Sequence, residues 1–316
     1  MRIAVVGAGI AGVGCAWLLS PGHTVDVYSA DAWMGGHART LDVTVGGASF
    51  PVDTGFQVFN ERTYPNLIRF FDRLGTPWQE SDMSFSVSVA AEGVEWSGTN
   101  LNTVFAQRSN ALKPRFLAML ADVVRFSHDA ERLLRDPALE TMSLGDLLSR
   151  EKYSAGFSDW YLIPMGAAIW STPPGMMLDY PAATFLRFCD NHGLLHITNK
   201  PIWRSVVGGS RLYVASALQS LSGEAYAGEP VESVQRVDGA VRVRTAARTQ
   251  DYDAVIIAAH PPETLAMLGA DASPDERAVL GAIAYQPNDA LVSTDTTFPP
   301  EVRARVGLME LAHRTR

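Results

Sequence analysis

Three glycines near the start of the chain have the spacing of a phosphate-binding turn. They are Gly7, Gly9 and Gly12, in the segment Gly-Ala-Gly-Ile-Ala-Gly. In a strand–turn–helix unit, the first glycine permits the tight turn and the second lets a diphosphate approach the backbone. The third lets the helix pack closely on the strand. A diphosphate would accept hydrogen bonds from the free N–H groups at the start of the helix, where the helix dipole favours an anion. The spacing therefore predicts a dinucleotide site.

The residues on both sides of this turn have the pattern that such a site requires. Residues 3–6 are an apolar run, as expected of a buried parallel strand. A helical pattern follows and stops at Pro21-Gly22, and residues 24–28 have the pattern of a second strand. The number of glycines and the lack of a small-residue cleavage site argue against a secretory signal peptide. We therefore predict a strand–helix–strand unit here.

A serine occupies the position that binds ribose hydroxyls in such units. That position lies near the end of the second strand, about 20 residues after the glycines, and normally carries an acidic residue. Here it is Ser29, and Asp31 follows two residues later. A serine hydroxyl can hydrogen-bond a ribose, although more weakly than a carboxylate, and Asp31 can take over this role.

The segment after the second strand resembles one found at this point in the amine-oxidase-like FAD superfamily. Residues 33–40 read Trp-Met-Gly-Gly-His-Ala-Arg-Thr, which is similar to the superfamily's R-x-G-G-R-x-x-T. Trp33 stands in place of the first arginine, and His37 in place of the second. The resemblance assigns to FAD contact the residues Gly35, Gly36 and Arg39. A surface salt bridge is an equally good interpretation of Arg39.

Two further segments extend the resemblance. Residues 52–59 are similar to the superfamily's D-x-G segment, which passes the flavin ring and implies a contact at Gly55. Asp53 would be structural there and cap the turn. In the superfamily the start of a later hairpin contacts the adenine half of FAD, which implies this role for Val231. Within this superfamily, the sequence most resembles a bacterial branch whose members are labelled NAD/FAD-binding proteins or FAD-dependent oxidoreductases.

The resemblance implies an α/β fold in which a glutathione-reductase-type FAD-binding Rossmann domain carries an inserted α+β substrate domain. We assign residues 1–60 and 205–285 to the FAD-binding domain and residues 61–204 to the insertion. Residues 286–316 would begin a returning substrate segment and end in an atypical basic tail. Superfamily members usually continue further, so we expect a C-terminally truncated member.

Composition indicates a globular protein of about two domains. The 316 residues are 47% hydrophobic and 19% charged, and the net charge of −8 leaves no basic excess for a nucleic-acid partner. The two cysteines, Cys15 and Cys189, are expected to be reduced packing residues, which fits a cytoplasmic protein. No apolar run is long enough to span a bilayer. A basic amphipathic pattern over residues 110–135 leaves peripheral membrane contact open, although packing on a core is favoured.

The catalytic residues have the weakest signal in the sequence. Residues 160–188 are rich in aromatic and methionine side chains, which suits both a core and an apolar substrate cavity. His192 is the candidate polar group that touches the substrate. His196 lies four residues later, but Gly193 ends the helix between them and no third ligand is visible. We therefore expect no metal site.

Three functions fit these observations. The first is an FAD-dependent oxidoreductase of the amine-oxidase or desaturase type, in which an apolar amine or lipid-like substrate gives a hydride to flavin N5. The second is a flavin-dependent isomerase or mutase, which shows no net redox turnover. The third is a catalytically inactive, truncated family member. Because one fold hosts many chemistries, the fold alone does not choose among them.

Overall fold

The chain forms two compact units. The computed structural model describes residues 1–81, 83, 85–170, 172–195, 200–285 and 292, with the backbone of 309–312. Unit 1 comprises residues 1–57, 66–79 and 205–292. Unit 2 comprises residues 58–65, 80–204 and 293–316. Most of the predicted returning segment and basic tail, residues 286–316, lies outside the described residues.

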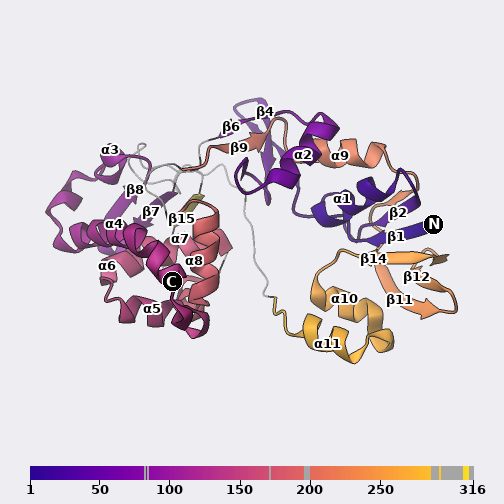
Figure 1. Cartoon of the computed structure of the whole chain (residues 1–316). Helices are drawn as coiled ribbons and strands as arrows, with labels where there is room; N and C mark the ends of the chain where they lie inside the picture. The colour runs from indigo at the N-terminus through magenta and orange to yellow at the C-terminus, as the bar shows by residue number, and fades with distance from the viewer. Residues whose placement is uncertain are drawn as a thin grey trace. The chain divides into compact units, whose positions relative to one another are not determined.

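A parallel four-stranded sheet forms the centre of unit 1 (Figure 1). Its order is β10 (Ala225–Tyr226), β2 (Thr24–Tyr28), β1 (Arg2–Val6) and β14 (Ala254–Ile257). β1 (Arg-Ile-Ala-Val-Val) and β2 (Thr-Val-Asp-Val-Tyr) are buried at every position except the first, as expected of parallel strands that are covered on both faces. Helix α1 (Ile10–Leu19) connects these two strands and begins directly after Gly9. This unit confirms the predicted Rossmann-like α/β fold.

The other elements of unit 1 surround this sheet. The helices are α9 (Arg211–Gln219), α10 (Pro261–Leu268), α11 (Pro274–Gly281) and most of α2 (Pro65–Leu74). One antiparallel sheet contains β11 (Val231–Val237), β12 (Ala240–Thr245) and β13 (Thr249–Tyr252), and a second contains β3 (Thr40–Val45) and β4 (Ala48–Asp53). The turn between β11 and β12 passes through Gly239 at φ 71°, a conformation that glycine adopts without strain.

The division between the units differs from the predicted one at α2. Sequence analysis assigned residues 66–79 to the inserted domain, whereas the structure places them in unit 1. The reason is aromatic packing: Phe70 meets Trp17 of α1 edge to face at a centroid distance of 5.1 Å, and Phe71 lies 5.0 Å from Tyr213 of α9. Phe71 is fully buried, so α2 belongs to the core of unit 1.

A buried carboxylate ties three strands of unit 1 together. Asp26 of β2 is 1% exposed and accepts hydrogen bonds from Arg2 Nη2, from the Tyr252 hydroxyl and from the Glu224 N–H, each at 2.9 Å. Burial raises the pKa of Tyr252 far above its usual range, so this hydroxyl stays protonated and donates. The Tyr28 hydroxyl lies 2.6 Å from that of Tyr252 and extends the network.

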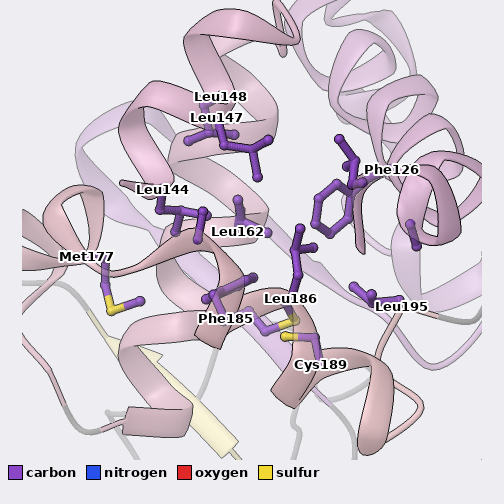
Figure 2. Packing of buried hydrophobic residues seen from close by; sticks show 14 of the residues in the cluster. Phe126, Leu144, Leu147, Leu148, Leu162, Met177, Phe185, Leu186, Cys189 and Leu195 are labelled. Atoms are coloured by element: carbon purple, nitrogen blue, oxygen red, sulfur yellow. The ribbon is translucent and has the colours of Figure 1, made fainter. Parts of the chain in front are cut away.

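Unit 2 is mainly helical. Its helices are α3 (Leu101–Val104), α4 (Pro114–Leu134), α5 (Leu144–Arg150), α6 (Ala155–Phe157), α7 (Ile163–Trp170) and α8 (Ala182–Asn191). Figure 2 shows the core of this unit, where side chains from α4, α5 and α8 point toward one another. Leu144, Leu147, Phe185 and Leu186 are fully buried there. This core positions the strands and short helical turns that line a cavity described below.

Shorter elements complete the chain. The strands are β5 (Phe59–Asn60), β6 (Trp78–Ser81), β7 (Phe85–Val89), β8 (Val94–Ser97), β9 (Trp203–Val206) and β15 (Met309–Ala312). The 3-10 helices are η1 (Ala90–Glu92), η2 (Arg108–Leu112), η3 (Pro137–Thr141), η5 (Pro174–Asp179) and η6 (Gly269–Asp271). β7 and β8 form an antiparallel hairpin, with Val87 opposite Trp96.

A π-helical turn, η4 (Ser158–Leu162), separates α6 from α7. Pro164, which has no N–H, follows it and cannot donate to the Trp160 carbonyl one turn earlier. The Trp96 indole Nε1 donates to that carbonyl at 3.1 Å, so the buried oxygen is satisfied from β8. Tyr161 lies within this turn, so the wider π-helical geometry sets the direction of its side chain.

Asp122 on α4 gives unit 2 a stability that depends on pH. It accepts hydrogen bonds from the Ser154 N–H at 2.7 Å and from Arg125 Nη2 at 2.8 Å. Burial alone would raise the pKa of Asp122, but these hydrogen bonds outweigh it and hold the pKa below its usual value. The stabilisation is therefore complete above the unfolded pKa of about 3.9 and is lost as the pH falls through the lower folded value.

We expect Asp122→Asn to be less stable than the wild type at neutral pH, with a difference that shrinks below about pH 4. Guanidinium unfolding of both proteins between neutral pH and pH 3 measures this difference. A stability difference between the two proteins that stays constant from neutral pH to pH 3 would contradict the ionic origin of the stabilisation.

Candidate nucleotide site and aromatic cavity

A cavity of about 700 Å³ lies at the carboxyl ends of β1 and β2 in unit 1, and we call it the nucleotide cavity. Its wall begins at Val6, the last residue of β1, and at Tyr28, the last residue of β2. Residues from the start of β11 and from α10 close it. In open α/β sheets, ligands bind in the crevice outside the carboxyl ends of the strands, which is the position of this cavity.

The three glycines of the turn have different surroundings. Gly7 has φ 105°, and a Cβ atom there would lie 2.5 Å from the Ala258 carbonyl oxygen. A Cβ atom on Gly12 would lie 1.8 Å from the Gly7 carbonyl oxygen. Gly9 has an ordinary φ of −67° and no atom within 4 Å of the position of a Cβ. Gly7 and Gly12 are therefore required by packing, whereas Gly9 leaves open space beside the first turn of α1.

The loop after β2 packs directly on this turn. The Gly35 N–H donates to the Ala8 carbonyl at 2.8 Å, and a Cβ atom on Gly36 would lie 3.0 Å from the Gly9 Cα. A Cβ atom on Gly55 would lie 2.4 Å from the His37 carbonyl oxygen, so the D-x-G segment approaches the same loop. Three backbone segments that are distant in sequence therefore meet around one opening.

The structure brings most of the predicted cofactor residues together. Those that line the nucleotide cavity are Gly7, Gly9, Ser29, Gly36, Arg39, Gly55 and Val231. Gly12 and Gly35 lie outside the lining and hold the shape of the turn. The Ser29 hydroxyl donates to the Trp33 carbonyl at 3.0 Å, so its hydrogen already has a partner. The Arg39 guanidinium lies 4.0 Å from the centre of the Trp33 ring, which it covers.

Several charged residues of this cavity were not predicted. His260 and Glu263 enter from the start of α10, and Glu229 and Glu232 flank Val231. Glu229 pairs with Arg248 at 2.7 Å. The signal for His260 and Glu263 was their position just after the predicted strand at residues 253–259, because ligands bind at the carboxyl ends of the strands in a Rossmann fold.

Asp53 has a different structural role from the expected one. Its carboxylate accepts hydrogen bonds from Thr40 Oγ1 at 2.6 Å, from the Ser210 N–H at 2.9 Å and from Ser210 Oγ at 3.0 Å. It therefore fixes the residue that precedes α9, rather than capping the turn before Gly55. The sequence could not show this, because Ser210 lies 157 residues away.

A second cavity, of about 470 Å³, lies within unit 2, and we call it the aromatic cavity. One wall consists of Phe85, Trp96 and Tyr161, whose rings lie 5.8 to 6.5 Å apart. The described lining residues include no aspartate or glutamate. Burial raises the pKa of Tyr161 far above its usual range, so its hydroxyl stays protonated. Phe85 and Trp96 were missed in the sequence because aromatic residues in a strand pattern are equally typical of a core.

His192 lines the aromatic cavity and has no place in the nucleotide cavity. It follows the last residue of α8, where its ring stacks on Phe188 at a centroid distance of 3.9 Å. Its Nδ1 atom lies 2.9 Å from the Phe188 carbonyl oxygen. Lys200 lines the same cavity. His196 lies outside the described residues.

The described residues contain neither a metal-binding cluster nor a membrane-spanning helix. Among these residues no group of three or more His, Cys, Asp and Glu side chains is placed to hold a metal ion. Of the helices that the structure describes, none is long and apolar enough to cross a membrane.

Comparison with known proteins identifies the fold. Residues 5–74 match the NAD(P)-binding Rossmann-like domain family. A putrescine oxidase variant matches with a TM-score of 0.65 at 18% identity, over 89% of this chain and 63% of that one. Cyclohexylamine oxidase from Brevibacterium oxydans gives 0.65 at 18% identity, over 89% and 62%. A CLA-producing fatty acid isomerase from P. acnes gives 0.62 at 16% identity, over 89% and 63%. No curated protein matches the sequence.

The chain has the fold that these oxidases and the isomerase share, and its N-terminal part has a Rossmann-like fold. This is the fold that the resemblance to the amine-oxidase-like superfamily implied. The chain spans less than two thirds of the length of each of these structures.

Proposed function

We propose that unit 1 binds FAD and that the protein is an FAD-dependent oxidoreductase acting on an apolar amine or lipid-like substrate. The observation that carries this proposal is the open space at Gly9, within a 700 Å³ cavity built around the start of α1. The residues at this turn fit the FAD diphosphate. A Cβ atom at Gly9 would fill space that no protein atom occupies, and this space lies beside the free N–H groups of α1. Putrescine oxidase and cyclohexylamine oxidase, which share the fold, support an oxidoreductase.

Different residues around the cavity would bind different parts of FAD. The free N–H groups in the first turn of α1 would donate to the diphosphate, and Arg39 would add positive charge nearby. Asp31, which lies shortly after β2, would accept hydrogen bonds from ribose hydroxyls, since the Ser29 hydroxyl hydrogen is engaged. Val231 would pack on the adenine. When bound, FAD supplies a hydride acceptor at its N5 atom.

The aromatic cavity supports an apolar substrate. Its wall of Phe85, Trp96 and Tyr161 is aromatic, and its described lining has no carboxylate to pair with an ammonium group. An amine would therefore bind in its neutral form, and a lipid-like chain needs no such change. His192 would touch the substrate and hold or move a proton at a ring nitrogen.

We expect His192→Phe to lower turnover about 100-fold, because the variant keeps the stacking on Phe188 but loses both ring nitrogens. FAD uptake should not change, since His192 does not line the nucleotide cavity. His128→Phe is the matched control, an exposed histidine on α4 outside the aromatic cavity. Steady-state kinetics would contradict the proposed role if both variants kept wild-type turnover.

A flavin-dependent isomerase is the second candidate. The observation that favours it is the shared fold of the P. acnes fatty acid isomerase. An isomerase would convert its substrate without consuming an electron acceptor.

An anaerobic experiment separates these functions. The FAD-loaded protein is mixed with candidate amines and unsaturated fatty acids, and its visible spectrum is recorded while products are analysed. Bleaching with formation of an oxidised product supports the oxidoreductase. A rearranged product with an unchanged final spectrum supports the isomerase. FAD-loaded protein that neither bleaches nor forms a product with any of the amines or fatty acids would contradict both the oxidoreductase and the isomerase function.

A further inference from the structure

One surface of unit 2 differs in charge from the rest of the chain. Residues 97–121 contain no aspartate or glutamate, although the whole protein has a net charge of −8. The same stretch contains three cations, Arg108, Lys113 and Arg115. Arg115 forms ion pairs with two carboxylates, Glu92 at 2.6 Å and Asp159 at 2.5 Å, so this cluster of three groups contributes no positive charge.

The other two cations have uncharged partners. Arg108 Nη2 donates to Asn102 Oδ1 at 2.7 Å, and Lys113 Nζ donates to the Gly93 carbonyl at 2.7 Å. These hydrogen bonds fix the two side chains without cancelling their charge. An anion that approaches Arg108 and Lys113 therefore meets two positive charges, although Glu92, beside the carbonyl that Lys113 binds, belongs to the acidic cluster around Arg115.

The same stretch of chain carries the two most exposed large apolar side chains of the described residues. Leu112, at the end of η2, is 86% exposed, and Leu101, the first residue of α3, is 77% exposed. The hydrogen bond from Arg108 to Asn102 joins η2 to α3, so the two leucines lie on neighbouring segments. Figure 1 shows α3 at the edge of unit 2.

The backbone that presents these leucines is firmly attached to β8. The buried Asn110 donates its Nδ2 to the Glu95 carbonyl at 2.9 Å. Gln107 accepts from the Glu95 N–H and donates to the Gly93 carbonyl, each at 2.9 Å. The polar side chains of this stretch therefore turn inward while the leucines face solvent. The exposure results from a defined local structure.

We propose that this surface, formed by Leu101, Arg108, Leu112 and Lys113, docks on the surface of an anionic lipid bilayer. The leucines enter the region between headgroups and acyl chains, and the two cations meet the lipid phosphates. A pair of isolated leucines flanked by cations suits a bilayer better than a protein partner, because a stable protein interface needs a broad, complementary apolar area. This docking does not depend on FAD chemistry.

Vesicle co-sedimentation of the full chain tests the proposal. We expect binding to vesicles of phosphatidylcholine with phosphatidylglycerol, weaker binding at high salt, and little binding to phosphatidylcholine alone. Arg108→Gln with Lys113→Gln should weaken binding roughly 25-fold, since each cation near an anionic surface contributes about fivefold. Leu101→Ser with Leu112→Ser should weaken it at least tenfold.

Leu18→Ser is the matched control, an exposed leucine of α1 at 64% exposure in unit 1. It should bind vesicles as the wild type does. Circular dichroism shows whether every variant is folded, and none of the substituted side chains is buried. The proposal is overturned if the wild type does not sediment with anionic vesicles, if both double variants bind normally, or if Leu18→Ser weakens binding equally.

Discussion

Gly9→Val is expected to abolish FAD uptake while the protein still folds. The valine side chain enters the one part of the glycine turn where no protein atom lies within 4 Å of the Cβ position. That space is the proposed position of the FAD diphosphate, so the side chain displaces the ligand and not the protein. We expect the Kd for FAD to rise at least about 100-fold, which corresponds to roughly 3 kcal/mol.

Gly12→Ala is the comparison variant, because it should change the stability of the fold, whereas Gly9→Val should change FAD binding alone. A Cβ atom there would lie 1.8 Å from the Gly7 carbonyl oxygen, so the substitution forces the turn or α1 to move. We expect Gly12→Ala to lower the thermal unfolding temperature, and Gly9→Val to leave it unchanged in the absence of FAD. Fluorescence titration with FAD and thermal unfolding separate the two effects. Normal FAD binding by Gly9→Val would contradict the proposed position of the diphosphate.

Asp26→Ala is expected to destabilise unit 1 by about 3 kcal/mol. The substitution leaves the Glu224 N–H without its acceptor, removes the ion-pair partner of Arg2, and takes from the buried Tyr252 hydroxyl its charged acceptor. For a unit of this size the unfolding temperature should fall by roughly 6–12 °C. Asp42→Ala is the control, because Asp42 pairs with Arg211 in solvent and this exposed pair contributes little. Equal unfolding temperatures for Asp26→Ala and the wild type would contradict the importance of this network.

The Rossmann unit was predictable because its signals are local. The glycine spacing, the apolar residues 3–6 and the break at Pro21-Gly22 all lie within one short segment, and each reflects a backbone requirement that sequence alone reveals. The structure also gathers Ser29 and Val231 around the cavity, although they lie 202 residues apart. That placement came from the resemblance to a family, because no local pattern joins them.

The sequence failed where the outcome depends on long-range packing. α2 belongs to unit 1 because Phe70 and Phe71 meet rings on α1 and α9. Asp53 bonds to Ser210 for a similar reason. In the aromatic stretch, Phe185 is fully buried whereas Tyr161 lines a cavity. Residue type does not separate these roles, since aromatic side chains serve a core and an apolar cavity equally well.

The central claim is that the cavity in unit 1 is an FAD site. Titration of the purified wild-type chain with FAD, followed by the quenching of flavin fluorescence, tests it most directly. The account predicts saturable binding of one FAD per chain, which Gly9→Val lacks. A folded wild-type chain that takes up no FAD would contradict the claim.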